Sequence, residues 1–268
     1  MVLAKELAVA TQLALEAGNL LRRYRETRLD VGYRNFGEPV TVADLLADDL
    51  ICSGLASEFP EDWICSEEIR DEPDRLTCNR VWMVDALNST GNFVDHGDEF
   101  CVSIGLTVRG EPVLGVIYNP VRDELFAGAI DCGVSLNGYS VKASGITLLR
   151  NARVTVSSEE WRRGFRQFGE APLFYPVPSS AYRLGRVAAG IDDASVSLMS
   201  GREWTTCAGA ALIVAAGGVV CNKDRTPLTY NSPELRHPDG FGASGKALSD
   251  SVLTSLATEF GPTLRYAA

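Results

Sequence analysis

Apolar residues near the N-terminus recur at alternating steps of four and three, which is the spacing of one face of a helix. They predict one long amphipathic helix over residues 2–26, with its apolar face formed by Leu3, Leu7, Ala10, Ala14, Ala17, Leu21 and Tyr24. The Gly-Glu-Pro segment at residues 37–39 interrupts the chain, and a second helix is expected from Thr41 to about Phe59. Thr41 and Asp44 have the spacing of a capping box, with Asp in place of the usual Glu or Gln.

Short runs of strand-favouring residues, separated by turn residues, fill most of the first half after the second helix. Asn137 and Gly138 separate two apolar positions in the way that a tight β-hairpin requires. This spacing predicts an antiparallel meander. Its expected strands are residues 100–108, 112–118 and 124–129, and they follow separate strands expected at residues 63–65 and 82–84.

The second half of the chain alternates strands and helices, which predicts a layered α/β arrangement. The expected strands are residues 154–156, 194–198 and 219–221, and the expected helices are residues 180–189, a helix capped by Thr205 or Thr206 that runs to Ala216, and residues 249–260. The join between the halves is expected within residues 140–152. The chain therefore divides into an α+β half at residues 1–145 and an α/β half at residues 146–268.

The composition excludes several classes of protein. With 268 residues and 46% hydrophobic content, the chain can bury a sizeable core. A formal charge of −10 argues against a nucleic acid polymer as partner. No apolar stretch reaches the roughly 20 residues of a membrane helix and no secretory signal is visible, so we expect a cytoplasmic protein without a membrane partner. Seven cysteines without a C-x-x-C pair argue against a zinc site or a disulfide framework.

Candidate chemistry gathers around Asp85, which follows an apolar run and precedes a polar turn, as expected at the open end of a buried strand. The surrounding segment, residues 82–93, resembles the signature of the inositol monophosphatase family of magnesium-dependent phosphatases. Three further segments resemble family motifs in the same order: residues 38–44 (D-x-V-T-x-x-D), residues 66–68 (G-E-E) and residues 203–218 (W-D-x-A-A-G, then A-G-G). Together they span nearly the whole chain.

The resemblance implies a five-layer αβαβα fold of the sugar-phosphatase type, a homodimer, and hydrolysis of a small phosphorylated metabolite with magnesium. It assigns the first metal site to Glu67, Asp85 and the backbone carbonyl of Leu87. Oxygen ligands of this kind suit magnesium, which also keeps several waters and binds substrate phosphate directly.

Two catalytic residues are also implied by the resemblance. Asp44 and Thr90 match the pair that orients the attacking water, and the backbone amides around Ser89 and Thr90 match the phosphate-binding turn. Asp44 can serve in this way and begin a helix at the same time. The segment at residues 169–186 lies where the family shapes its substrate pocket, and the candidates there are Ser180, Tyr182 and Arg183.

Four positions depart from the family pattern. Asn88 and Thr205 replace two of the three aspartates of the second metal site, so two negative charges are lost and affinity for a second magnesium ion should fall by orders of magnitude. The amide and the hydroxyl would each still offer a neutral oxygen, and Thr205 is expected to cap its helix. Ser89 replaces a glycine, where its side chain either obstructs the phosphate or donates a new hydrogen bond, and Ala86 replaces a proline.

Two functions are consistent with this pattern. The first is an attenuated phosphatase of a small monoester, such as an inositol or sugar phosphate or a 3′-phosphonucleotide, which uses one or two loosely held magnesium ions, with the second site weakened. The second is a family member without hydrolytic activity, either a binding subunit or an enzyme that performs other acid/base chemistry on a small metabolite.

Overall fold

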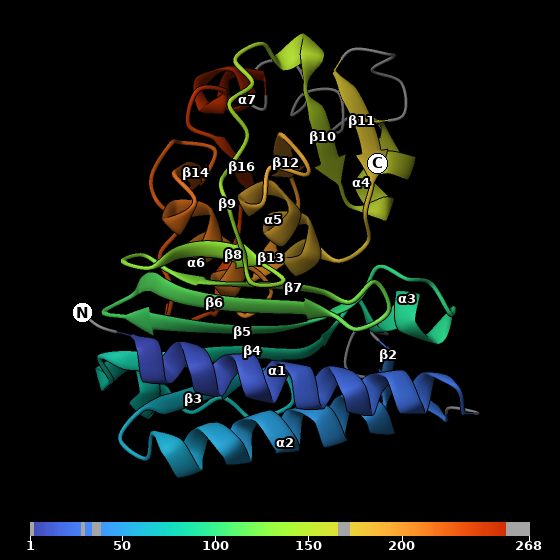
Figure 1. Ribbon diagram of the computed structural model, residues 1–268, viewed down its shortest axis with the longest axis vertical. Helices are drawn as coiled ribbons and strands as arrows, with labels where there is room; N and C mark the ends of the chain where they lie inside the picture. The colour runs from blue at the N-terminus through green and yellow to red at the C-terminus, as the bar shows by residue number, and fades with distance from the viewer. Residues whose placement is uncertain (1–2, 28–29, 34–38, 166–171, 256–268) are drawn as a thin grey trace.

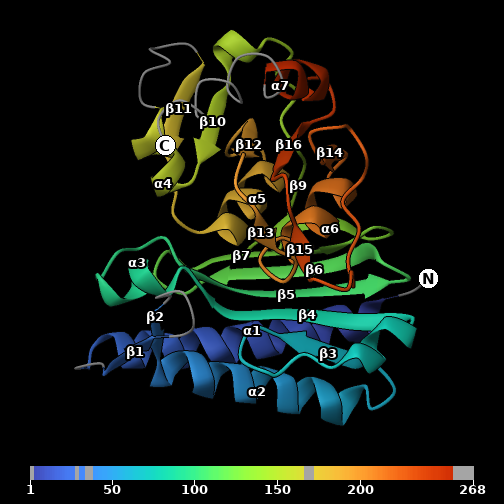
Figure 2. The same cartoon turned by 180° about the vertical axis from the view of Figure 1, so that it is seen from behind.

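The computed structural model of the protein describes residues 3–27, 30–33, 39–165 and 172–255 (Figure 1). Its elements stack as helix, sheet, helix, sheet and helix, and the layers are visible from both sides (Figures 1 and 2). The three helical layers are the pair α1 (Ala4–Arg25) and α2 (Val42–Glu58), the pair α5 (Ser180–Ala188) and α6 (Cys207–Ala215), and the outer helices α4 (Ser158–Arg163) and α7 (Ser249–Ser255). The five-layer αβαβα architecture expected from the sequence is confirmed.

The first sheet has seven strands that follow the chain order. β3 and β4 are parallel and all later neighbours are antiparallel, so the expected meander is confirmed. Asn137 and Gly138 form the last hairpin turn with φ angles of 50° and 82°. The strands are β3 (Trp63–Ser66), β4 (Arg80–Asn88), β5 (Cys101–Val108), β6 (Glu111–Asn119), β7 (Glu124–Ala129), β8 (Gly133–Leu136) and β9 (Tyr139–Val141).

The second sheet has five strands in the order β11-β10-β12-β16-β14. Its first three strands are parallel, and β16 is antiparallel to both of its neighbours. Strand β16 was not predicted, because its residues, Phe-Gly-Ala-Ser-Gly, are mostly small and have little strand preference. The strands are β11 (Leu173–Pro176), β10 (Arg153–Val156), β12 (Ala194–Ser197), β16 (Phe241–Gly245) and β14 (Gly218–Cys221).

The predicted N-terminal helix is α1, and its apolar stripe is buried, including Ala10, Ala14, Ala17 and Leu21. The predicted closing helix is present as α7, while its expected residues 256–260 lie outside the described residues, as does Glu38. The short elements are α3 (Thr90–Val94), the pair β1 (Val31–Tyr33) and β2 (Pro39–Thr41), the pair β13 (Gly201–Arg202) and β15 (Arg236–His237), and the 3-10 turns η2 (Pro73–Thr77) and η3 (Leu149–Asn151).

The two halves of the chain meet where α6 lies against the first sheet. A Cβ atom on Gly105 would lie 2.6 Å from Cys207 Sγ, and one on Gly115 would lie 2.1 Å from the Ala208 carbonyl oxygen, so only glycine allows this approach. Residues of both halves form one apolar cluster, among them Met83, Ile117, Phe126, Tyr182, Leu184 and Leu212. Because both halves of the chain contribute to this core, the division into two parts at residue 145 stays a proposal.

Candidate active site

Glu67 and Asp85 come from the carboxyl ends of two neighbouring parallel strands. Ser66 is in register with Val84, and the Glu67 N–H continues this ladder by donating to the Val84 carbonyl oxygen at 3.3 Å. In-register residues of adjacent strands direct their side chains to the same face of a sheet, so the two carboxylates share one side of this edge. Asp85 is buried and Glu67 is half-buried.

Asp44 lies in the first turn of α2, where the predicted capping box is confirmed. Its Oδ2 accepts the Thr41 N–H at 2.8 Å and the Thr41 hydroxyl at 2.6 Å. Its Oδ1 accepts the Thr90 hydroxyl at 2.8 Å, from a residue 46 positions further along the chain. Both Asp44 and Thr90 are buried, so this hydrogen bond is shielded from water.

The turn between β4 and α3 carries a strained residue. Ser89 has φ 79° and ψ 55°, which is the left-handed conformation that glycine adopts without steric cost. Its side chain makes no capping hydrogen bond to α3. The conformation is consistent with the glycine expected at this position in the family, and it is maintained here by a residue for which it is unfavourable.

Asn88 bridges Asp85 and the start of α5. Its Nδ2 donates to Asp85 Oδ2 at 2.7 Å, and its Oδ1 accepts the Ser179 hydroxyl at 2.5 Å and the Ala181 N–H at 3.2 Å. The expectation that this amide offers its oxygen to a cation beside Asp85 is therefore wrong. The nitrogen faces Asp85, and the oxygen is taken by α5.

Thr205 also differs from its expected role. The N-cap of α6 is Thr206, whose side chain makes no capping hydrogen bond, and the Thr205 hydroxyl donates to the Arg202 carbonyl oxygen at 2.8 Å. The expectation that Thr205 caps the helix is thus wrong, because its side chain closes the preceding turn instead. Its hydroxyl proton is directed into that turn.

The turn that carries Thr205 is anchored by the buried Glu203. This carboxylate accepts the Asn231 N–H at 2.6 Å, and it accepts both the N–H, at 3.2 Å, and the hydroxyl of Ser232. Burial raises the pKa of Glu203, and the hydrogen bonds from Ser232 act in the opposite direction. Arg75 extends the anchor to the first half, because its guanidinium donates to Asn231 Oδ1 at 2.8 Å.

A second buried acid of α2, Asp48, was missed in the sequence analysis. It accepts hydrogen bonds from the Ser66 hydroxyl and, at 3.7 Å, from Cys52 Sγ. Ser66 Oγ in turn accepts the Glu68 N–H at 3.0 Å, so Asp48 supports the strand end that presents Glu67. Burial raises the pKa of Asp48 to about 6. Its spacing of one helical turn from Asp44 is the signal that would have revealed it.

The three substrate-pocket candidates lie in the first turn of α5. Ser180 is half-buried, whereas Tyr182 and Arg183 are buried. The Tyr182 hydroxyl donates to Glu124, and Arg183 donates to the Val177 carbonyl oxygen at 2.9 Å and to Ser195 Oγ at 3.2 Å. These contacts do not favour Tyr182 or Arg183 as substrate ligands, while Ser180 stays a prediction.

The two expected metal sites differ in how well their donor atoms suit a magnesium ion. Glu67, Asp85 and the Leu87 carbonyl supply oxygen atoms of the type that magnesium binds, with room in its coordination for waters. The second set does not fit, because an amide N–H faces Asp85 and the Thr205 hydroxyl is bonded to its own turn. Within the described residues, no group of three or more His, Cys, Asp or Glu side chains is arranged to hold a metal ion.

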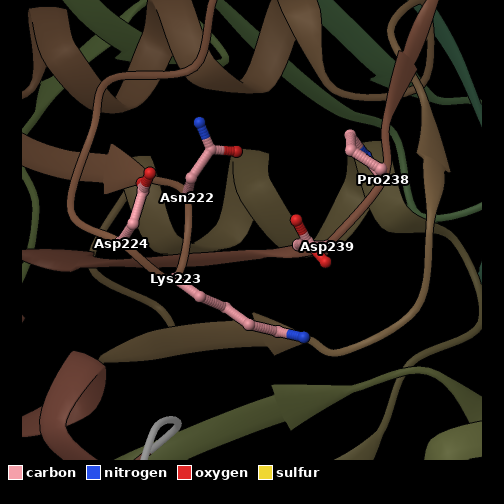
Figure 3. A pocket seen from close by; sticks show the side chains of 5 residues that line it. All are labelled: Asn222, Lys223, Asp224, Pro238 and Asp239. Atoms are coloured by element: carbon pink, nitrogen blue, oxygen red, sulfur yellow. The ribbon is translucent and has the colours of Figure 1, made fainter.

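A separate hollow of about 220 Å³ lies in the C-terminal half (Figure 3). It is lined by Asn222, Lys223, Asp224, Pro238 and Asp239, none of which belongs to the site around Asp85. The chemistry expected from the sequence therefore does not coincide with this hollow.

Five αβαβα layers, with acids at the carboxyl ends of β3 and β4, define a sugar-phosphatase-type protein. The chain belongs to the inositol monophosphatase family, whose model matches residues 3–255. Members of this family depend on magnesium and act on small phosphorylated substrates, which supports a phosphatase-like function. The resemblance carried by the four sequence segments is confirmed.

Individual relatives agree with this assignment. Inositol monophosphatase 2 of Solanum lycopersicum is 33% identical over 262 residues, which cover 92% of this chain and 96% of that protein. The 3′(2′),5′-bisphosphate nucleotidase CysQ of Aggregatibacter actinomycetemcomitans is 28% identical over 234 residues, which cover 83% of this chain and 86% of that protein.

Solved structures show the same fold. An inositol monophosphatase from Anabaena (Nostoc) sp. PCC 7120 has a TM-score of 0.78 at 28% identity, and the match covers 95% of this chain and 96% of that one. The Thermotoga maritima IMPase has a TM-score of 0.83 at 22% identity, covering 98% and 100%, and this likeness concerns the fold alone. Among the described residues, no helix is both long and apolar enough to cross a membrane.

Proposed function

We propose that the protein hydrolyses a small phosphate monoester, an inositol or sugar phosphate or a 3′-phosphonucleotide, with one magnesium ion and at an attenuated rate. The observation that carries this proposal is the buried hydrogen bond from Thr90 Oγ1 to Asp44 Oδ1, beside the strand ends of Glu67 and Asp85. The names of the relatives, an inositol monophosphatase and a bisphosphate nucleotidase, support the two substrate classes.

Asp44 and Thr90 act on the attacking water in this proposal. Thr90 passes its hydroxyl proton to Asp44 Oδ1 and takes a proton from the water through the same oxygen. Thr41 holds the other oxygen of Asp44 with two hydrogen bonds, so Oδ1 is the one left to receive a proton. A positioned general base of this kind typically contributes about 10²–10⁴-fold to a rate.

Glu67, Asp85 and the Leu87 carbonyl would hold the magnesium ion, which would supply positive charge to the phosphate oxygens and help to activate the attacking water. The Thr90 hydroxyl lies 3.2 Å from the Leu87 oxygen, but its single proton is directed to the closer and charged Asp44, so the carbonyl keeps its lone pairs. The backbone amides at Ser89 and Thr90 receive the phosphate.

The proposed attenuation follows from the two residues, Asn88 and Thr205, that stand at the expected second metal site. With neutral Asn88 and Thr205 there, no second cation neutralises the departing oxygen, and monoesters with good leaving groups should be preferred. The homodimer implied by the family also belongs to this proposal, and the molar mass in solution from light scattering tests it.

The experiment is phosphate release from inositol phosphate, sugar phosphates and adenosine 3′,5′-bisphosphate across a magnesium titration. We expect slow, magnesium-dependent release from at least one of them, and its loss in Asp44→Asn. Absence of release from every substrate at saturating magnesium would overturn the proposal.

A second candidate function is a family member that binds a phosphorylated metabolite without hydrolysing it. The observation that favours it is the Asn88 nitrogen directed at Asp85, where a cation would require an oxygen. The double variant Asn88→Asp with Thr205→Asp separates the two functions. A rise in phosphate release supports an attenuated phosphatase, whereas binding of substrate without release in both proteins supports the binding role.

A further inference from the structure

The orientation of the Asn88 amide is determined by its neighbours. The Ala181 N–H can only donate a hydrogen bond, so the atom that faces it at 3.2 Å must be the amide oxygen. The Asp85 carboxylate faces the other end of the amide at 2.7 Å, and an amide nitrogen is the partner that a carboxylate requires. The Ser179 hydroxyl completes the arrangement by donating to the same oxygen at 2.5 Å.

Presenting the amide oxygen to a cation would require rotation of the side chain by half a turn. That rotation would place the NH₂ group against the Ala181 N–H and would leave the buried Ser179 hydroxyl with only the weak acceptor Cys101 Sγ, at 3.3 Å. It would also remove the donor from Asp85. Because Asn88 and Ser179 are both buried, water cannot replace these hydrogen bonds, so the observed orientation is strongly favoured.

The charge of the site is balanced in the same way. Replacing two carboxylates with Asn88 and Thr205 removes two negative charges, which is the charge that a divalent cation would have neutralised. Asp85 then keeps one negative charge, faced by the positive end of an amide dipole whose oxygen lies at the N-terminus of the nine-residue helix α5. Asp85 Oδ2 is thus bonded by the amide without a second ion.

We propose that the Asn88 side chain replaces the second metal ion of this site, as a fixed neutral bridge that joins Asp85 of the first half to α5 of the second half. Asn88 is thereby a positioning residue, which aligns the Asp85 carboxylate and the start of α5 without a cation between them. The inference rests on the proposed metal site at Glu67 and Asp85, but it does not require that the protein hydrolyses phosphate.

The first test counts bound Mn²⁺ by equilibrium dialysis and electron paramagnetic resonance in the wild-type protein and in Asn88→Asp/Thr205→Asp. We expect one ion per chain in the wild type and two in the double variant. Asn79→Asp, the same chemical change at an exposed residue, is the matched control and should bind one ion. Two ions per chain in the wild type would overturn the inference.

The second test measures thermal unfolding in EDTA and in excess magnesium. In EDTA, the double variant should unfold roughly 4–8 °C below the wild type, because a carboxylate then lies against Asp85 with no cation between them. Magnesium should remove this deficit. Asn88→Ala should show a similar deficit that magnesium does not remove, because no ligand is gained.

An outcome in which the double variant is as stable as the wild type in EDTA would contradict the bridging role. The outcomes for hydrolysis are separate from these. A wild-type protein that binds one Mn²⁺ ion and releases no phosphate would end the proposed function and leave the Asn88 bridge in place. A wild-type protein that hydrolyses phosphate and binds two ions would support hydrolysis and overturn the Asn88 bridge.

Discussion

Two polar residues of the candidate site, Asp44 and Asn88, receive their hydrogen bonds from different halves of the chain. On the α2 side, Asp44 is bonded by Thr41 and Thr90, both from the first half of the chain. On the α5 side, Asn88 is bonded by Ser179 and Ala181 of the second half. The Asp44 carboxylate can receive a proton, whereas the Asn88 amide cannot.

Under the proposed function, the acid/base pair of Asp44 and Thr90 is thus held independently of the residues around Asn88. The Asp44–Thr90 pair depends on a helix cap and one strand end, so substitutions near α5 leave it unchanged. In the proposed Asn88 bridge, hydrogen bonds from Ser179 and Ala181 align the two halves. Chemistry and alignment are thus carried by separate residues.

Thr90→Ala tests the chemical side of this comparison. Loss of the hydroxyl interrupts proton transfer to Asp44, so we expect kcat for phosphate release to fall about 10²–10⁴-fold with little change in KM. Thr90→Ser retains the hydroxyl and should keep most of the activity. A Thr90→Ala protein with wild-type kcat would remove the pair from the mechanism.

The pH dependence of stability tests the support beneath Glu67. Burial raises the pKa of Asp48 from 3.8 to about 6, so between these values the folded protein binds a proton that the unfolded chain has released. Stability from this group therefore falls as pH rises from about 4 to about 6, by at most about 3 kcal/mol.

Asp48→Asn should abolish this component, because the amide has no proton to lose and can still bond to Ser66. Urea unfolding at the two ends of the pH range measures the difference. Asp239→Asn, at an exposed position in the second half of the chain, is the control and should leave the pH dependence of the wild type unchanged. An identical pH dependence in Asp48→Asn and the wild type would show that Asp48 titrates normally.

Ser179→Ala tests the alignment of the two halves through Asn88. The variant loses the cap of α5, a hydrogen bond to the Tyr182 N–H at 3.1 Å, and also the donor to Asn88. We expect the free energy of unfolding to fall by about 2 kcal/mol. Thr205→Ala, which removes one hydrogen bond from a half-buried residue, should cost less than about 1 kcal/mol. Equal costs would mean that the Ser179 and Thr205 side chains contribute equally to the stability of the protein.

Ser89→Gly should have a small effect, and it is a stabilising one. Relief of the left-handed backbone strain at φ 79° should raise the free energy of unfolding by about 1 kcal/mol, seen as a rise in Tm of roughly 2–4 °C. Unchanged or lower stability would contradict this account. Phosphate release then decides the role of the side chain, because it increases if Ser89 obstructs the phosphate and decreases if its hydroxyl donates to it.

Local patterns predicted much of this molecule correctly. The α1 helix, the Thr41–Asp44 capping box and the meander after β4 all follow from spacing within a few residues or from a single turn. The placement of Glu67 beside Asp85 also follows, since both were expected at strand ends. Strand β16 was missed because its position in the centre of a sheet, between β12 and β14, determines its conformation more than its small residues do.

The chain's residue types establish the family and the layered fold, and they place a neutral amide, Asn88, shortly after Asp85. They leave open which atom of Asn88 faces that acid. The answer comes from Ser179, which lies 91 residues further along the chain and reaches Asn88 only when the second half packs onto the first. The direction of a buried amide depends on which donors surround it, and those donors are brought together by long-range packing that spacing along the chain does not describe.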